Sequence, residues 1–482
     1  MLTRIRSSCF LCLGLMLAAC ANPPPDKAVY LGPERDRADL FLHDDLLVAR
    51  SEGVAVTPST IRKHPGNPVL VHDKPWEKGM LNYTCVLHDV DEGVYKMWYQ
   101  MVTASTDGTR YSACHYAVSQ DGVHWEKPAV GLVEHDGSTE NNILFVESEN
   151  VNGTPSYWVI KDYAEPDPAR RYKMMRHSWD FQGRAAQLGW SADGVRWTFS
   201  EFGNLPGSID SQNVFFWDRQ AGRYVGYFRS HVGGLRSVAR ATSPDLFHWS
   251  RLTTIHSPDE NDPPTWHLYT PGIWKLSLAR QAYVMVSTGF DEKSHEAYGQ
   301  LGVSRDGIGW HRFREPFLSL GGENDWDGGA IYTIASETTI DGRTAVFYHG
   351  SNTPAHSREG RRGIGIAFLD PGGFVGRTAA QEGYLITHPL RIADDRSRFY
   401  LLAAVAPGGS IAAELLTTDE VVLDGFSRHD SNAIEGQGDA LAIRWRGEES
   451  LKRHLREGPV RLKLYLENAT VYGFRARRPR TD

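Results

Sequence analysis

Carboxylates beside aromatic residues are the parts of this chain best suited to chemistry. Glu77 follows Trp76, Asp327 follows Trp326, and Asp262 precedes the aromatic run WHLYTPGIW. A carboxylate can give or take a proton, and an aromatic ring can stack on the apolar face of a sugar. The same rings could equally pack between structural elements, and Asp327, which two glycines follow, could equally be a turn residue.

Basic side chains and further aromatic residues could complete a ligand site. Arg229 lies two residues before His231, and such a pair could hold phosphate. Tyr269 lies in the aromatic run after Asp262, and His349 stands in YHGSNTPAH, although a lone histidine is more often structural than catalytic. No metal-ligand triad is visible in the sequence, so we expect neither a metal nor a cofactor.

The N-terminus carries the features of an export signal. Arg4 and Arg6 precede an apolar run, CFLCLGLML, that is shorter than the roughly 20 residues of a transmembrane helix. The following LAAC, ending at Cys20, resembles the lipobox of bacterial lipoproteins, whose cysteine is lipidated; an ordinary secretory signal is the alternative. We predict a signal over 1–20, a lipid anchor at Cys20 as the chain's contact with the membrane, and a periplasmic or outer-membrane place in the cell envelope. Residues 21–64, which begin ANPPPDK, are interpreted as a proline-stiffened tether and N-terminal segment.

Two cysteines remain outside the signal. Cys85 and Cys114 could form one disulfide in an oxidising envelope, but their spacing suits neither a metal site nor a cysteine–histidine nucleophile. We interpret them as two buried small side chains.

The composition favours many short strands and excludes a nucleic-acid partner. The 482 residues include 14 Trp, 20 Tyr and 19 Phe against 47 Gly and 25 Pro. Aromatic runs broken by Gly and Pro are typical of strands joined by turns. The formal net charge is -7, so the basic footprint of a nucleic-acid-binding protein is missing. A chain of this length needs more than one core, and we expect more than one domain.

One phrase, Ser-x-Asp-Gly-x-x-Trp, recurs after apolar strands. It occurs in YAVSQDGVHW, LGWSADGVRW and LGVSRDGIGW, and in ATSPDLFHW with the glycine replaced; its serines are Ser119, Ser191, Ser304 and Ser243. The aspartate can accept hydrogen bonds from backbone amides, and glycine takes a left-handed conformation easily. The tryptophan can fold back over the hairpin and fill the gap to the next sheet. We therefore interpret the phrase as a structural turn that closes the outer hairpin of a repeated unit.

The repeat has the size of a propeller blade. A half-buried aromatic strand precedes each turn, as in VYKMWYQMV and RYVGYFRSH, and a fifth such strand is RTAVFYHGS. A repeat of roughly 50–70 residues with about four strands is typical of a blade. The sequence therefore predicts an all-β protein with a five-bladed β-propeller over 65–372. Segments such as EVVLDGFS and VRLKLYLENATVYGFR then alternate polar and apolar residues, which predicts a β-sandwich over 376–477.

This layout resembles the superfamily of invertase- and arabinanase-like glycoside hydrolases. Five blades with S-x-D-G-x-x-W turns, followed by a sandwich that ends in VRLKLYLENATVYGFR, are most similar to the two-domain order of glycoside hydrolase family 32. The resemblance covers almost the whole chain after the signal. It implies catalytic carboxylates on the inner strands of the first three blades, facing a central funnel, because breaking an acetal requires an acid and a second carboxylate as nucleophile or base.

The resemblance points to three carboxylates. Asp162 in VIKDYAEPD matches the family's Arg-Asp-Pro motif, and Asp210 in GSID stands where the family has its Glu-Cys acid motif. The blade I nucleophile motif is missing, with Asn82 near its position, and Glu77 is the nearest carboxylate. The resemblance then implies Asp210 as general acid, Glu77 as base or nucleophile, and Asp162 as the group that stabilises the sugar cation. Candidate substrate-binding residues are Trp76, Arg229, Asp262, Tyr269, Trp326, Asp327 and His349.

The resulting hypothesis is a glycoside hydrolase of the cell envelope that acts on a furanoside or related oligosaccharide. A non-catalytic carbohydrate-binding lipoprotein and a glycoside phosphorylase on the same fold remain alternatives, and a sialidase-like enzyme is a third. The number of carboxylates that face the funnel discriminates hydrolysis from binding. The sequence indicates neither the sugar and linkage nor the oligomeric state.

Overall fold

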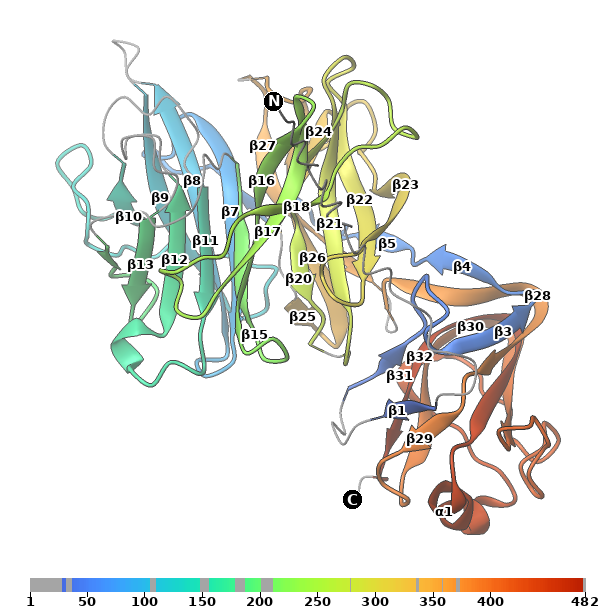
Figure 1. Cartoon of the computed structure of the whole chain (residues 1–482). Coiled ribbons are helices and arrows are strands. Elements are labelled where there is room, and N and C mark those ends of the chain that lie inside the picture. The colour runs from blue at the N-terminus through green and yellow to red at the C-terminus, as the bar shows by residue number, and fades with distance from the viewer. Residues whose placement is uncertain are drawn as a thin grey trace, which may run out of the picture.

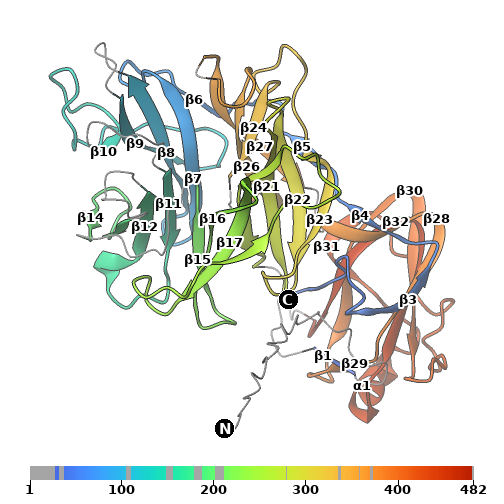
Figure 2. The same ribbon diagram turned by 45° about the horizontal axis from the view of Figure 1, so that its top comes forward.

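The chain forms two all-β domains, a five-bladed propeller and a C-terminal β-sandwich (Figure 1). The computed structural model describes residues 28–31, 37–104, 110–147, 156–177, 187–200, 211–277, 279–334, 338–357, 359–369 and 373–479. Both views show the sandwich beside one edge of the propeller (Figure 2). The fold class expected from the sequence, including the five-bladed propeller that the resemblance implied, is confirmed.

Each blade is an antiparallel sheet whose first strand lies innermost, and four blades are built from consecutive chain. Blades I and II comprise β7 (Met80–Asp89), β8 (Val94–Ala104), β9 (Arg110–Ser119) and β10 (Ile143–Val146), then β11 (Ser156–Lys161), β12 (Tyr172–His177), β13 (Gln187–Ser191) and β14 (Thr198–Phe199). Blades III and IV comprise β15 (Val214–Asp218), β16 (Arg223–Val232), β17 (Leu235–Ser243) and β18 (Thr253–His256), then β19 (Trp266–Thr270), β20 (Ile273–Lys275), β21 (Tyr283–Asp291), β22 (Ala297–Ser304) and β23 (His311–Leu318).

The fifth blade is closed by the N-terminal segment. It comprises β24 (Ala330–Thr333), β25 (Thr338–Ile340), β26 (Arg343–Ser351) and β27 (Arg362–Leu369). Its outer strands are β5 (Ile61–Lys63) and β6 (Leu70–Val71), which pair antiparallel with β27. The propeller therefore includes residues N-terminal to the expected boundary at 65. Because its outer strands come from the N-terminal segment, blade V has no serine–aspartate turn leading from β27 to an outer strand.

The serine–aspartate turns occupy the same place in four blades, between the third and fourth strands. In the turn at Ser191, the hydroxyl accepts from the amide of Gly194 at 2.9 Å, and Asp193 accepts from two amides at 2.8 Å. Leu246 takes the glycine position in the blade III turn with φ +69°, in the same left-handed conformation as Gly194. The hydroxyl of Ser243 still accepts a hydrogen bond from the amide of Leu246 at 2.8 Å. The interpretation of the phrase as architecture is confirmed.

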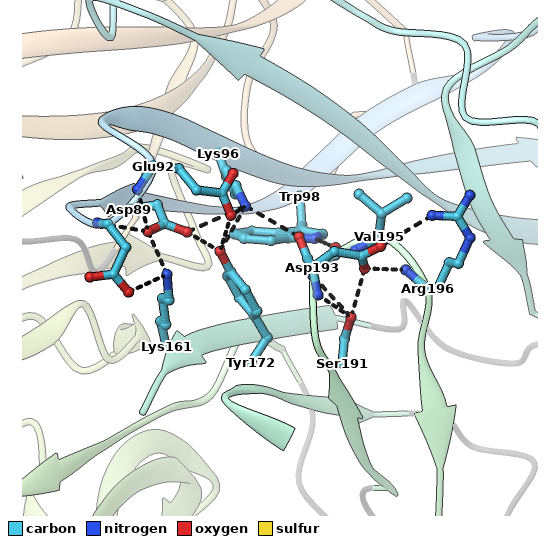
Figure 3. Close-up of polar contacts among 12 residues, drawn as sticks. Asp89, Glu92, Lys96, Trp98, Lys161, Tyr172, Ser191, Asp193, Val195 and Arg196 are labelled. Atoms are coloured by element: carbon cyan, nitrogen blue, oxygen red, sulfur yellow. Dashed lines mark hydrogen bonds and ion pairs between the residues drawn. The ribbon is translucent and has the colours of Figure 1, made fainter. Parts of the chain in front are cut away.

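A buried carboxylate at the end of each of the first three inner strands accepts a hydrogen bond from a tyrosine of the next blade. Asp89, at the end of β7, is fully buried; it accepts from Tyr172 at the start of β12 and pairs with Lys161 at 2.6 Å and Lys96 at 3.3 Å (Figure 3). Burial alone would raise the pKa of Asp89, but the hydrogen bonds from Lys161 and Tyr172 outweigh it and hold that pKa far below its usual range. We use the term inter-blade pin for a buried carboxylate at the end of an inner strand that accepts a hydrogen bond from a tyrosine of the next blade.

The sandwich is built around three long strands, β28 (Val375–Thr387), β30 (Arg398–Leu416) and β32 (Arg461–Arg477). Register shifts between Ala379 and Glu382 and between Val405 and Ser410 bend them, so that the sheet wraps around its own apolar core. The remaining elements are β31 (Gln437–Ala442), β29 (Leu390–Ile392) and a single described helix, α1 (Glu448–Glu457).

The N-terminal segment also supplies strands to the sandwich. The strands β2 (Asp39–Leu40), β3 (Val48–Glu52) and β4 (Ala55–Pro58) join the main sheet, and β1 (Val29–Leu31) pairs with β29. In both views β3 and β4 lie near β28, and β1 lies beside β29 (Figures 1 and 2). From Val29 onward, the described parts of the N-terminal segment therefore carry strands of both domains, and edge pairing satisfies the backbone groups of these strands.

The two folded cysteines are separate thiols. Cys85 and Cys114 are both fully buried and free, as the sequence interpretation expected. Burial raises the pKa of the Cys85 thiol to about 12, and its sulfur lies 3.3 Å from the amide nitrogen of Val159 in the next blade. Among the described residues, no helix has the length and apolar character needed to cross a membrane.

Candidate functional site

The inner strands begin at one face of the propeller, which we call the strand-start face. Gln212, just before β15, donates to the carbonyl of Thr84 in blade I at 2.6 Å. Ser156, at the start of β11, donates to the carbonyl of Ser211 at 2.7 Å, and Ser211 in turn donates to the carbonyl of Tyr269 at 3.4 Å. These bonds hold the beginnings of four inner strands together around the propeller axis.

Tyr269 on β19 is the centre of a group of basic and aromatic side chains at this face. The guanidinium carbon of Arg229, from β16, lies 4.7 Å from the ring centroid, and Nη2 of Arg229 donates to the Tyr269 carbonyl at 2.5 Å. The guanidinium of Arg236, from β17, lies 5.3 Å from the same ring and 5.9 Å from the ring of Phe290. Two arginines of blade III therefore reach over a tyrosine of blade IV.

Blade V supplies the other side of this group. Tyr332 on β24 lies with its ring centroid 5.6 Å from that of Tyr269, and its cross-strand partner His349 lies 5.6 Å from it. Nε2 of His356 is 3.2 Å from the Tyr269 hydroxyl, and the backbone amide of His356 donates to the Tyr332 hydroxyl at 3.3 Å. Arg362, at the start of β27, donates to the carbonyl of Ser357. The arginine–tyrosine cluster is defined as Arg229, Arg236, Tyr269, Tyr332, His349, His356 and Arg362.

The positive charge of the cluster comes from its arginines. Burial, reinforced by the charge of Arg362, keeps the pKa of His349 well below its usual value, and partial burial together with Arg236 lowers that of His356. Both imidazoles are therefore neutral at pH 7. Burial raises the pKa of Tyr332 to about 12, so its hydroxyl stays a hydrogen-bond donor. The Glu292 carboxylate, whose charge acts on His356, has a side chain that is 65% exposed and pairs with His267 at 3.2 Å.

This arrangement suits the recognition of hydroxyl and oxyanion groups. Guanidinium forks and phenol hydroxyls donate hydrogen bonds, and a neutral imidazole can take up or pass on a proton. Aromatic rings at the same face offer apolar surfaces on which the C–H face of a sugar can stack. Among the described residues, no group of three histidine, cysteine, aspartate or glutamate side chains is placed to hold a metal ion.

Glu77 lies at the strand-start end but belongs to a buried network in blade I. Its carboxylate is 2% exposed, accepts from the Tyr99 hydroxyl at 2.5 Å, and pairs with Lys127 at 2.6 Å. The backbone amides of Asp73 and Lys74 donate to it at 2.9 and 3.0 Å. With its lone pairs used inside the protein, Glu77 anchors the loop before β7, and its predicted place in the pocket is corrected.

Asp162 lies at the opposite end of the inner strands, because it follows β11 whereas Glu77 precedes β7. It accepts a hydrogen bond from the Tyr224 hydroxyl of blade III and pairs with Lys173 at 3.2 Å. Asp162 is therefore an inter-blade pin, like Asp89. A cavity of about 330 Å³ beside it is lined by Trp190, Trp217 and ion-paired groups. The structure therefore separates Glu77 from Asp162, contrary to the predicted convergence, and Asp210 lies outside the described residues.

The remaining predicted binding residues divide into two groups. Arg229, Tyr269 and His349 come together in the cluster. The other four have partners elsewhere in the protein. Asp262 pairs with Arg312 and Arg314, and Asp327 pairs with Lys63 at 2.6 Å. The Trp76 ring nitrogen donates to Asn142 at 2.7 Å, and the Trp326 ring stacks on Tyr348 with their centroids 5.7 Å apart. The 2% exposed Asp327 also accepts from the Tyr348 hydroxyl at 2.8 Å, so an internal ion pair explains it better than contact with a ligand.

Sequence reasoning missed three residues of the cluster, Arg236, Tyr332 and Arg362, whereas His356 ends the stretch YHGSNTPAH that it had singled out. Arg236 follows the tight turn at Gly233 and Gly234, both with positive φ, and no motif marks it. Tyr332 lies five residues after Asp327, at the end of the stretch ENDWDGGAIY. Successive side chains of a strand point to opposite faces, so its position next to Ile331 is the signal that would have placed it on the other face of the sheet.

Comparisons with known proteins found likenesses among solved structures alone. No protein-family model matches the chain, and no curated protein matches it. A β-1,2-mannobiose phosphorylase from Listeria innocua is 12% identical, with 64% of this chain and 96% of that one covered and a TM-score of 0.47. The catalytic domain of an α-L-arabinofuranosidase from Coprinopsis cinerea is 12% identical, with 65% and 98% covered and a TM-score of 0.45. An endo-arabinase from Bacteroides thetaiotaomicron is 13% identical, with 64% and 96% covered and a TM-score of 0.41.

Proposed function

We propose that this protein is a carbohydrate-active enzyme that cleaves a glycosidic bond at the strand-start face of its propeller. The observation that carries the proposal is the arginine–tyrosine cluster, in which side chains of blades III, IV and V meet where the inner strands begin. Aromatic rings beside convergent hydrogen-bond donors are what a sugar-binding site requires. The sequence resemblance to propeller glycoside hydrolases supports the same class of reaction.

Hydrolysis is the leading form of this reaction. It needs a general acid at the leaving oxygen, and the sequence-based candidate is Asp210, which immediately precedes Ser211 in the chain. Asp210→Asn should lower turnover by roughly 10²–10⁴-fold if this residue is the acid. Asp245→Asn is the matched control, since Asp245 forms the blade III turn rather than any part of the cluster.

Phosphorolysis is the second candidate, and the guanidinium of Arg229 over Tyr269 favours it. Arginine holds phosphate with two parallel hydrogen bonds, and bound phosphate would attack the sugar in place of water. A non-catalytic carbohydrate-binding protein remains the third possibility, because a fold does not by itself imply activity.

One experiment separates these functions. The full-length protein is incubated with a library of oligosaccharides, with and without inorganic phosphate, and the released sugars are identified by mass. Free sugar formed without phosphate supports hydrolysis, and sugar 1-phosphate formed only with phosphate supports phosphorolysis. Tyr269→Ala should abolish either product. Binding without any product would contradict the enzymatic proposal.

We further propose that the protein is a lipoprotein of the cell envelope, anchored at Cys20. This rests on the sequence alone, because residues 1–27 lie outside the described part of the chain.

A further inference from the structure

Buried cations in this protein are generally neutralised by a carboxylate. Lys96 pairs with Asp89, and Arg312 pairs with Asp262. The same holds for further lysines and arginines that are largely buried: Lys173, Lys275, Arg377 and Arg475. This pattern is expected, because a charge moved out of water needs a counter-charge or a full set of hydrogen bonds.

Arg362 departs from this pattern. The residue is 7% exposed, and its guanidinium donates to the carbonyls of Ser357 and, at 3.5 Å, Leu81. A guanidinium carries five donors, and these carbonyls use two of them. Within the described part of the chain, no carboxylate forms an ion pair with Arg362.

Arg236 presents a second guanidinium to the same place. It is half-buried, its side chain lies against the rings of Tyr269 and Phe290, and it forms no ion pair with any described residue. Both guanidiniums lie near the phenol of Tyr332 and act on it electrostatically. Arg236 lies over the Tyr269 ring, whose centroid is 5.6 Å from that of Tyr332, and Arg362 donates to the carbonyl of Ser357, beside the His356 amide that donates to the Tyr332 hydroxyl. The neutral His349 is 2% exposed, and its Nε2 has no hydrogen-bond partner among the described residues.

We propose that Arg236 and Arg362 form an oxyanion subsite, and that the substrate of this site is a saccharide with an acidic substituent, such as a uronic acid. Two forked donors near the Tyr332 hydroxyl suit a carboxylate, which accepts two hydrogen bonds from one guanidinium. The neutral histidines add donors without adding charge. The proposal rests on the proposed function for the ligand being a saccharide, and inorganic phosphate is the other source of the same oxyanion chemistry.

The test compares the affinity of matched acidic and neutral ligands for the full-length protein by calorimetry. The probes are oligosaccharides of galacturonate, mannuronate and glucuronate, each beside its methyl ester, and inorganic phosphate alone. At least one acid should bind about tenfold or more tightly than its ester, because a hydrogen bond to a charged group is worth at least that ratio. The preference should weaken as the salt concentration rises.

Variants locate the effect. Arg236→Gln and Arg362→Gln should each remove the preference for the acid, and Arg236→Lys should restore part of it because the charge remains while the fork is lost. Arg361→Gln is the matched control, since Arg361 is exposed and meets Asn352 through its backbone amide. Thermal unfolding of each variant shows whether the fold is kept. Arg236→Gln should disturb the fold less than Arg362→Gln, because Arg236 is only half-buried.

The outcomes separate this inference from the proposed function. Equal affinity for acids and esters would overturn the acidic substrate while leaving glycoside cleavage in place. Binding of inorganic phosphate alone, lost in Arg362→Gln, would overturn the acidic substrate and assign the subsite to phosphate. If none of the saccharides binds in either form, both the subsite and the proposed function fail. A preference that survives in both glutamine variants would also overturn the assignment.

Discussion

Replacing Asp162 by asparagine should weaken the propeller rather than its chemistry. The carboxylate accepts the Tyr224 hydroxyl on one oxygen and the amide of Ala164 on the other, at 3.0 Å for the amide. Asparagine has one acceptor oxygen, so its NH₂ group must face one of these donors. Lys173 also loses a counter-charge, although it keeps Glu165 at 2.6 Å.

The expected cost follows from these contacts. Losing one hydrogen bond to a charged group at a site that is 5% exposed should lower the free energy of unfolding by about 2–3 kcal/mol. For a domain of this size that corresponds to a fall in melting temperature of roughly 5 °C. Asp89→Asn should cost more, about 3–5 kcal/mol, because two buried lysines then share no carboxylate at that position.

The assay is thermal unfolding followed by tryptophan fluorescence, together with turnover measured below the transition. Asp167→Asn is the matched control, since Asp167 is an exposed residue of the same loop and asparagine also caps the short turn that it begins. The predicted order of melting temperatures is Asp89→Asn below Asp162→Asn below Asp167→Asn. A normal melting temperature for Asp162→Asn combined with a roughly 100-fold loss of turnover would refute the inter-blade pin and restore the catalytic role.

Three further predictions concern the turns, acid stability and the anchor. Gly194→Ala should destabilise the propeller more than Gly93→Ala in urea unfolding, because both have positive φ but only at Gly194 would a new Cβ meet Trp98, at 2.8 Å; equal effects would contradict this packing. The pKa of Asp245 is lowered to about 2, where hydrogen bonds from His248 outweigh burial, so the stability it adds should be complete above about pH 4 and be lost as the pH falls toward 2. The difference in melting temperature between the wild type and Asp245→Asn should shrink over that window, and a constant difference would contradict it. Cys20→Ser should move the protein from the membrane to the soluble fraction, and retention in the membrane would refute the lipobox.

The repeat was readable from sequence because it is local. Ser119, Asp121 and Trp125 lie within seven residues, and the hydrogen bonds of the turn join neighbours in the chain. Asp162 was misread for the opposite reason, since its partner Tyr224 is 62 residues away. A blade-by-blade alignment would have set Asp162 beside Asp89 and Asp218, the residues that end the inner strands β7 and β15.

The candidate site was only partly predictable. Arg229, Tyr269 and His349 were chosen as single residues, and nothing in the sequence showed that three different blades bring them together. Arg362 is harder still, because its significance lies in having no carboxylate partner among the residues that the structure describes. A sequence displays charged residues, but only a structure shows which charges are left without a counter-charge.

The first strands of this protein can pair only after its last strands have been synthesised. β4 pairs with β28 and β5 with β27, more than 300 residues further along the chain, and β2 pairs with β32, more than 430 residues further along. Until the chain has been synthesised beyond residue 369, β2 and β4 have exposed edges, and the outer strands of blade V, β5 and β6, lack their partner β27. Closure is therefore a late event with a high contact order, and we expect slow folding and aggregation of chains that end before β28. The order of synthesis thus opposes the order of pairing, which favours keeping the whole chain unfolded until it is complete.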